Sequence, residues 1–122
     1  MRSAEEKLEF KRKLERRTME FSVSVFKALD SLPKRVSAQV VAAQLGRSAS
    51  SIGANYREAN RAESANDFSH KISIVLKECS ETLYWIEIEQ KLYDDSDGFV
   101  GFAGECEELL RLFQTIRRHV KK

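Results

Sequence analysis

The chain has 122 residues, of which 42% are hydrophobic, enough for one domain with a single core. Two cysteines are too few for a disulfide framework or a closed zinc site, and a formal net charge of +2 does not by itself indicate a partner. One proline, five glycines and 33% charged residues are typical of a helical protein with solvated outer faces. The charged N-terminus and the lack of a long apolar run predict neither a signal peptide nor a membrane span, so we expect a cytoplasmic protein without a membrane partner.

The first half of the chain predicts two amphipathic helices. Ser3 and Glu6 have the spacing of a capping box, and apolar residues then recur at steps of three, four and seven up to Pro33. Ser37 is the candidate N-cap of a second helix, whose apolar stripe continues to Ala59.

The second half of the chain predicts two further helices. Asn66 or Asp67 is the expected start of a third helix that continues to Leu92. Turn chemistry then interrupts the helical pattern for about eight residues, and the glycines of "DGFVGFAGE" precede the last helix. That helix carries an apolar stripe over residues 102–120.

The four segments predict an all-α fold. Nothing in the sequence alternates with the period of a strand. Four amphipathic helices with short links favour an up-down-up-down four-helix bundle, with residues 1–122 forming a single domain.

The second predicted helix carries a face of small residues. Gly46, Ser50 and Gly53 are four and three residues apart, so they lie near one another on one side. Because glycine in a helix interior costs about 1 kcal/mol relative to alanine, we interpret this face as a groove that a helix of the same chain or of another subunit approaches closely. Asn55 and Glu58 follow, and we expect Asn55 to be a polar core residue that fixes register or oligomeric state. We assign packing roles to both rather than catalysis.

The third predicted helix has a wide apolar face. Trp85, Ile88 and Leu92 lie beside its main stripe, so the face is wider than one core contact requires. We predict this strip to be a second contact surface.

No pattern in the sequence points to catalysis. A di-iron bundle needs two Glu-x-x-His pairs, whereas the nearest match is the single pair of Asp67 and His70. We expect His70 and His119 to be solvated near helix ends, which leaves no nucleophilic triad. Cys79 and Cys106 are interpreted as buried core thiols. We therefore predict no enzyme activity, no metal and no cofactor.

The predicted topology separates charge between the two ends of the bundle. The start of the first helix, the link between the second and third and the end of the fourth meet at one end. That end, which we call the basic end, collects Arg2, Lys7, Lys11, Arg12, Arg57, Arg61, Lys71, Arg117, Arg118, Lys121 and Lys122. The opposite end carries Asp94, Asp95, Asp97, Glu105, Glu107 and Glu108, together with Lys34 and Arg35.

A resemblance to a known family rests on the middle of the chain, from Arg47 to about Leu92. Its pattern, R-S-x-x-S-I-x-x-N-x-x-E, is carried by Arg47, Ser48, Ser51, Ile52, Asn55 and Glu58. This stretch resembles the four-helix-bundle family that includes proteins encoded by intervening sequences of bacterial 23S ribosomal RNA. The resemblance implies a left-handed bundle that assembles into a ring, a homopentamer, with no established enzymatic activity. Accessory proteins of diversity-generating retroelements are similar to this family and are strongly basic pentamers that bind nucleic acid and a reverse transcriptase, whereas this chain is nearly neutral.

Two functions follow as hypotheses. The first is a non-catalytic oligomeric scaffold, whose ring repeats the basic end and attracts RNA or DNA without reading the bases. The alternative is a protein–protein interaction adaptor, in which the apolar strip of the third helix receives another polypeptide.

Overall fold

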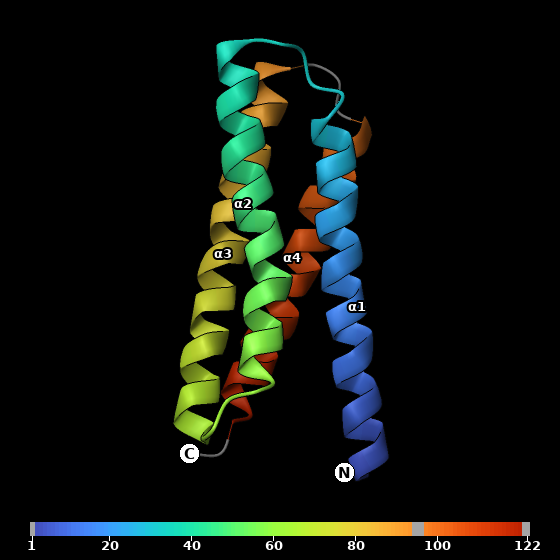
Figure 1. Cartoon of the computed structure of the whole chain (residues 1–122), viewed down its shortest axis with the longest axis vertical. Coiled ribbons are helices and arrows are strands. Elements are labelled where there is room, and N and C mark those ends of the chain that lie inside the picture. Colours follow the sequence, from blue (N-terminus) through green and yellow to red (C-terminus); the bar gives the residue numbers. More distant parts are fainter. Residues whose placement is uncertain (1, 94–96, 121–122) are drawn as a thin grey trace.

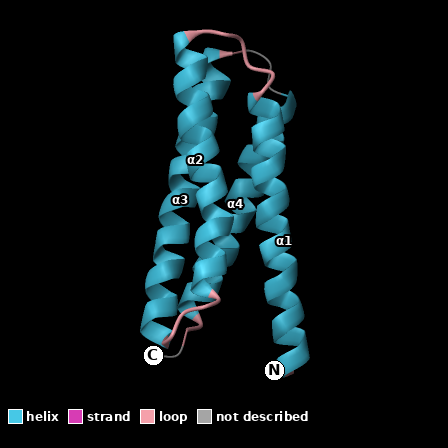
Figure 2. Cartoon of the chain, viewed as in Figure 1, coloured by secondary structure: helices cyan, strands magenta, loops and turns pink. Residues whose placement is uncertain are grey.

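Four long helices run side by side in the computed structural model, which describes residues 2–93 and 97–120 (Figure 1). They are α1 Ala4–Leu29, α2 Val36–Ala59, α3 Ala65–Leu92 and α4 Asp97–Arg118. The chain reverses direction between successive helices, and the described residues contain no strand (Figure 2). The predicted all-α, up-down-up-down four-helix bundle is confirmed. Within the described ranges, no helix is both long enough and apolar enough to cross a lipid bilayer.

The N-cap of α1 agrees with the prediction, whereas that of α3 does not. The side chain of Ser3 accepts a hydrogen bond from Glu6 N, and the side chain of Glu6 accepts one from Ser3 N, so the predicted capping box is confirmed. The start of α3 was predicted at Asn66 or Asp67, and this is wrong. Ser64 is the N-cap, and its hydroxyl accepts a hydrogen bond of 3.0 Å from Asp67 N. Several adjacent residues of this link have cap-forming side chains, so local chemistry did not single out one of them.

Two further boundaries differ from the prediction. Ser37 is not the N-cap of α2, because the helix begins at Val36 after Arg35, which makes no side-chain cap hydrogen bond. The hydroxyl of Ser37 instead lies 2.8 Å from the hydroxyl of Tyr93, just after α3. The link before α4 is also shorter than expected, since α4 begins at Asp97 and includes the glycines of "DGFVGFAGE". Burial of Phe99 in the core anchors this first turn despite the low helix propensity of glycine.

The core runs along the axis of the bundle and receives side chains from all four helices. Tyr56 of α2 and Phe113 of α4 are both fully buried, and their rings meet edge to face with centroids 5.2 Å apart. Helix α2 packs extensively on α1 and α3, and α3 packs on α4. The contact between α1 and α4 is the smallest of the four. Helix α1 is therefore attached to the bundle mainly through α2.

Candidate functional site

Helix α1 lies directly over the two glycines of the small-residue face of α2. A Cβ atom built on Gly53 would lie 2.9 Å from Thr18 Oγ1, and one built on Gly46 would lie 2.8 Å from Phe26 Cε1. Real Cβ atoms essentially never show contacts this short, so a side chain at either position would force its neighbour to move. The helix that approaches this face belongs to the same chain.

An apolar groove of about 350 Å³ runs along the outer side of this seam. Ser50 lines it, with its hydroxyl donating to Gly46 O at 2.8 Å. Helix α1 contributes Met19, Val23 and Phe26, which are 48%, 43% and 47% exposed and which we call the α1 ridge. Neighbouring exposed apolar side chains of this kind are typical of a contact surface.

The first residues of the R-S-x-x-S-I-x-x-N-x-x-E pattern, which we call the signature motif, connect α2 to α3. Arg47 forms ion pairs with Glu78, at 3.4 Å, and with Glu81, and the hydrogen bond to Glu81 raises the pKa of Arg47. The hydroxyl of buried Ser48 lies 3.0 Å from that of buried Thr82. Thr82 was not predicted to be a partner of Ser48, although both are polar residues beside the core-facing stripes of their helices. These residues have a packing role.

The later residues of the motif form hydrogen bonds within α2. Ser51 Oγ donates to Arg47 O at 2.7 Å, and Asn55 Nδ2 donates to Ser51 O at 2.8 Å. Asn55 is half-buried and Glu58 is exposed. Asn55 is therefore not the enclosed core residue that we expected, because the backbone of its own helix satisfies its amide.

The apolar strip of α3 is largely used within the chain. Trp85 and Ile88 are half-buried and pack against the core. The ring of Trp85 also meets that of Tyr84 edge to face, with centroids 5.4 Å apart. Only Leu92, at 49%, and Tyr84, at 59%, remain strongly exposed here. Packing inside the bundle therefore accounts for most of the width of this face.

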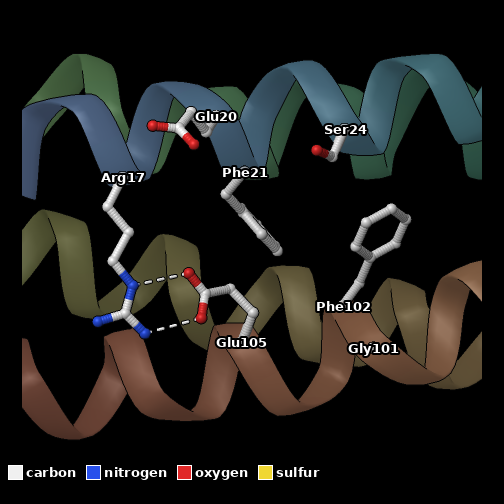
Figure 3. A pocket seen from close by; sticks show the side chains of 7 residues that line it. All are labelled: Arg17, Glu20, Phe21, Ser24, Gly101, Phe102 and Glu105. Carbon is white, nitrogen blue, oxygen red and sulfur yellow. Dashed lines mark hydrogen bonds and ion pairs between the residues drawn. The ribbon is translucent and has the colours of Figure 1, made fainter.

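A recess of about 300 Å³ opens between α1 and α4 (Figure 3). Arg17 of α1 donates two hydrogen bonds of 2.7 Å to the carboxylate of Glu105, which raises the pKa of Arg17. Beside this pair, the rings of Phe21 and Phe102 meet edge to face with centroids 6.0 Å apart (Figure 3). No local signal in the sequence indicates the pair of Arg17 and Glu105, since the two residues are 88 positions apart. Because Arg17 and Glu105 already pair with each other, we interpret the recess as a packing seam.

Three segments that are distant in sequence meet at the lower end of the bundle in Figure 1, as the topology predicted. They are the start of α1, the link between α2 and α3 and the end of α4. Their basic side chains are exposed, except for half-buried Lys71, and none forms an ion pair with a described carboxylate. These described residues of the basic end are Arg2, Lys7, Lys11, Arg12, Arg57, Arg61, Lys71, Arg117 and Arg118. Lys121 and Lys122 lie outside the described residues.

The acidic residues expected at the opposite end do not form one cluster there. Glu105 and Glu108 lie 2.7 and 3.7 Å from Arg17, so they belong to the contact between α1 and α4. The expected location was wrong for these two residues, because they lie beside Arg17 in the middle of α1 and not at the end of the bundle. Glu107 is exposed, as are Lys34 and Arg35 in the link between α1 and α2. Asp94, Asp95 and the side chain of Asp97 fall outside the described residues.

The residues with potential chemistry are dispersed. His70 and His119 are exposed, while Cys79 and Cys106 are free and buried. Cys106 Sγ donates to Cys79 O at 3.4 Å, and contact with the Cys79 thiol together with burial raises the pKa of Cys106. In the part of the chain that the structure describes, no three His, Cys, Asp or Glu residues are placed to hold a metal ion.

The fold and these contacts define a small all-α four-helix-bundle protein with a close seam between α1 and α2. Residues 11–115 match the family model of the 23S rRNA-intervening sequence protein, and the chain belongs to this family. The chain is also similar to a protein of unknown function from the S23 ribosomal protein family of Bacteroides thetaiotaomicron VPI-5482, whose crystal structure was determined at 1.70 Å resolution. The two are 29% identical, with a TM-score of 0.77 over 88% of this chain and 97% of the other. A comparison with curated proteins found no significant match.

Proposed function

We propose that this protein is a non-catalytic, oligomeric scaffold that binds RNA or DNA weakly through its basic end. The observation that carries the proposal is the gathering of exposed Lys and Arg side chains from three segments, none paired with a described carboxylate. Such side chains are available to phosphate groups, and their binding releases counterions from the nucleic acid.

The positive field of a single chain is moderate. Glu5, Glu6 and Glu9 lie on the first turns of α1, at the same end as the cations. The hydrogen bonds that Ser3 donates through its backbone and accepts at its hydroxyl fix Glu6 at the helix start, and they lower the pKa of Glu6, so its negative charge persists. Appreciable affinity therefore requires several copies of the basic end on one assembly.

Self-association through the α1 ridge supplies those copies. Met19, Val23 and Phe26 expose apolar surface on the α1 side of the bundle, while Tyr84 of α3 and Val100 of α4 expose it on other helices. A contact between two different patches is heterologous, and copies joined in this way close into a ring when the rotation permits. The occupant of the α1 ridge in this proposal is a second copy of the chain, and the family resemblance supports a homopentamer.

Nucleic-acid binding is tested by fluorescence anisotropy with a labelled oligonucleotide at low and high salt. We expect the triple variant Lys7→Gln, Arg57→Gln, Arg117→Gln to weaken binding. The slope of log Kd against the logarithm of the salt concentration should also fall by about two to three. The matched control, Lys34→Gln, Arg35→Gln, Lys91→Gln, loses the same charge outside the basic end and should bind like the unchanged protein. Equal losses in both variants, or binding that is indifferent to salt, would refute the proposed role of the basic end.

Assembly is tested by light scattering. A mass several times the 14.0 kDa of one chain is expected. Val23→Glu should reduce this mass, because it places a charge in the apolar contact. Val36→Glu introduces the same charge at a residue that is 78% exposed and outside the ridge, and should leave the mass unchanged. A monomeric unchanged protein would contradict the oligomeric scaffold.

The alternative is a protein–protein interaction adaptor that uses the surface of α3. The exposed side chains of Tyr84 and Leu92 favour it, although Trp85 and Ile88 are already packed against the core. A monomer that binds no oligonucleotide would support the adaptor over the scaffold.

A further inference from the structure

We infer that the basic end binds single-stranded nucleic acid by admitting one pyrimidine ring into an apolar recess, an inference that rests on the proposed function. The recess has a volume of about 150 Å³. Its apolar lining comes from all four helices and consists of Phe10, Tyr56, Phe68 and Ile116.

Cations border this apolar lining. Arg2, Lys7 and Lys11 also line the recess, and none of them forms an ion pair with a described carboxylate. Proteins that bind single strands combine the same two elements, since basic side chains follow the phosphates while aromatic rings receive the bases. The recess therefore lies where a phosphate backbone bound to the basic end would place a base.

The size of the recess favours one ring. An apolar cavity of about 150 Å³ is large enough to bind benzene. The six-membered ring of a pyrimidine has that size, whereas the fused rings of a purine are larger. Preferences of this kind are modest in single-strand binding, and they add to the sequence-independent phosphate contacts.

One contact at the recess shows how a base can bind there. The guanidinium of Arg2 lies 4.3 Å from the ring centroid of Phe10, so a planar cationic group already stacks on one face of this ring. A base that enters the recess stacks on Phe10 in the same way, either in place of Arg2 or beside it.

A base in a duplex is not available to the recess. It is stacked and paired, and its removal from the helix costs free energy that a single strand does not require. We therefore expect the recess to favour single strands over duplexes of the same length.

The test compares four labelled probes of equal length, namely oligo-dT, oligo-dA, a strand of abasic residues and a DNA duplex. The abasic strand keeps the phosphates and lacks the bases. We expect oligo-dT to bind about tenfold more tightly than the abasic strand and more tightly than oligo-dA or the duplex. Equal affinity for oligo-dT and the abasic strand, or preference for oligo-dA or the duplex, would overturn the inference.

A variant pair localises the effect. Phe10→Leu keeps an apolar side chain but removes the stacking ring, and should lower the ratio of oligo-dT to abasic affinity. Tyr84→Leu removes an exposed aromatic ring outside the basic end and should not change that ratio. Salt-dependent binding that is equal for all four probes refutes this inference alone, whereas no binding of any probe refutes the proposed function as well.

Discussion

Thr18 lies directly over Gly53, with its Oγ1 atom 2.9 Å and its Cβ atom 3.1 Å from the position that a Cβ on residue 53 would occupy. Thr18 is fully buried, and its hydroxyl donates to Glu15 O at 2.9 Å. Its branched side chain therefore has little freedom to turn away. At Gly46 the neighbour is the outer edge of the Phe26 ring, which is 47% exposed and free to swing toward solvent.

This difference predicts opposite effects for the same substitution at the two glycines. Gly53→Ala should lower the free energy of unfolding by about 1 kcal/mol, because the overlap with Thr18 outweighs the gain in helix propensity. Gly46→Ala should be neutral or stabilising by up to about 1 kcal/mol. Urea denaturation measures both. Gly53→Leu should disrupt folding more strongly, and equal effects of alanine at both glycines would contradict the argument.

A second substitution tests whether the clash with Thr18 causes the loss of stability in Gly53→Ala. Thr18→Ala removes Oγ1, the atom that a new Cβ would meet at 2.9 Å, but keeps the Cβ at 3.1 Å. The Gly53→Ala substitution should therefore cost less in the Thr18→Ala background. Strict additivity of the two changes would show that the clash is absent.

The hydroxyl pair of Ser48 and Thr82 is expected to stabilise the interface between α2 and α3. Thr82→Val keeps the shape but leaves buried Ser48 without this partner, and should cost about 1–2 kcal/mol. The double variant Ser48→Ala, Thr82→Val should cost less than the sum of the two single changes. A double-mutant cycle from urea melts measures the coupling, and a coupling of zero would contradict it.

The pair of Arg17 and Glu105 should contribute little to stability in spite of its geometry. The two side chains are 37% and 30% exposed, so solvent screens their attraction. Glu107→Gln changes an exposed carboxylate on the same helix and is the control. Glu105→Gln should lower the free energy of unfolding by more than the control does, but the difference should be below about 1 kcal/mol. We expect the difference to vanish in 1 M salt. A difference that persists there would indicate a mainly steric effect.

The buried thiol of Cys106 predicts a decrease in stability at alkaline pH. Contact with Cys79 and burial raise the pKa of Cys106 in the folded chain, so the folded state retains a proton that the unfolded state releases above about pH 8.5. The stabilisation is complete below that pH and decreases above it, by at most about 1.4 kcal/mol per pH unit. Denaturation between pH 7 and 10 measures the slope. Cys106→Ala should flatten it, and an unchanged slope would assign it to other groups.

Asn55 of the signature motif shows that the spacing of residues along a helix does not fix their contacts. Its regular spacing placed Asn55 on the same helix face as core residues, and the prediction of a buried polar residue followed from that spacing. In the structure, Asn55 is half-buried and donates to Ser51 O of its own helix. The spacing gives the side of the helix approximately, whereas a small rotation of α2 about its axis decides between core and edge.

By itself, the sequence determined the four helices, the capping box of Ser3 and Glu6, the close approach at Gly53 and the order of the charged segments. These depend on the 3.6-residue period, on neighbours within one turn and on the absence of a side chain, all of which are local. Only the tertiary structure decided that Arg17 pairs with Glu105 and that Trp85 packs inward. It also decided that the described cations of the basic end form no ion pair with a described carboxylate. Those outcomes depend on the rotation and axial register of each helix, which the packing of the whole core sets at once.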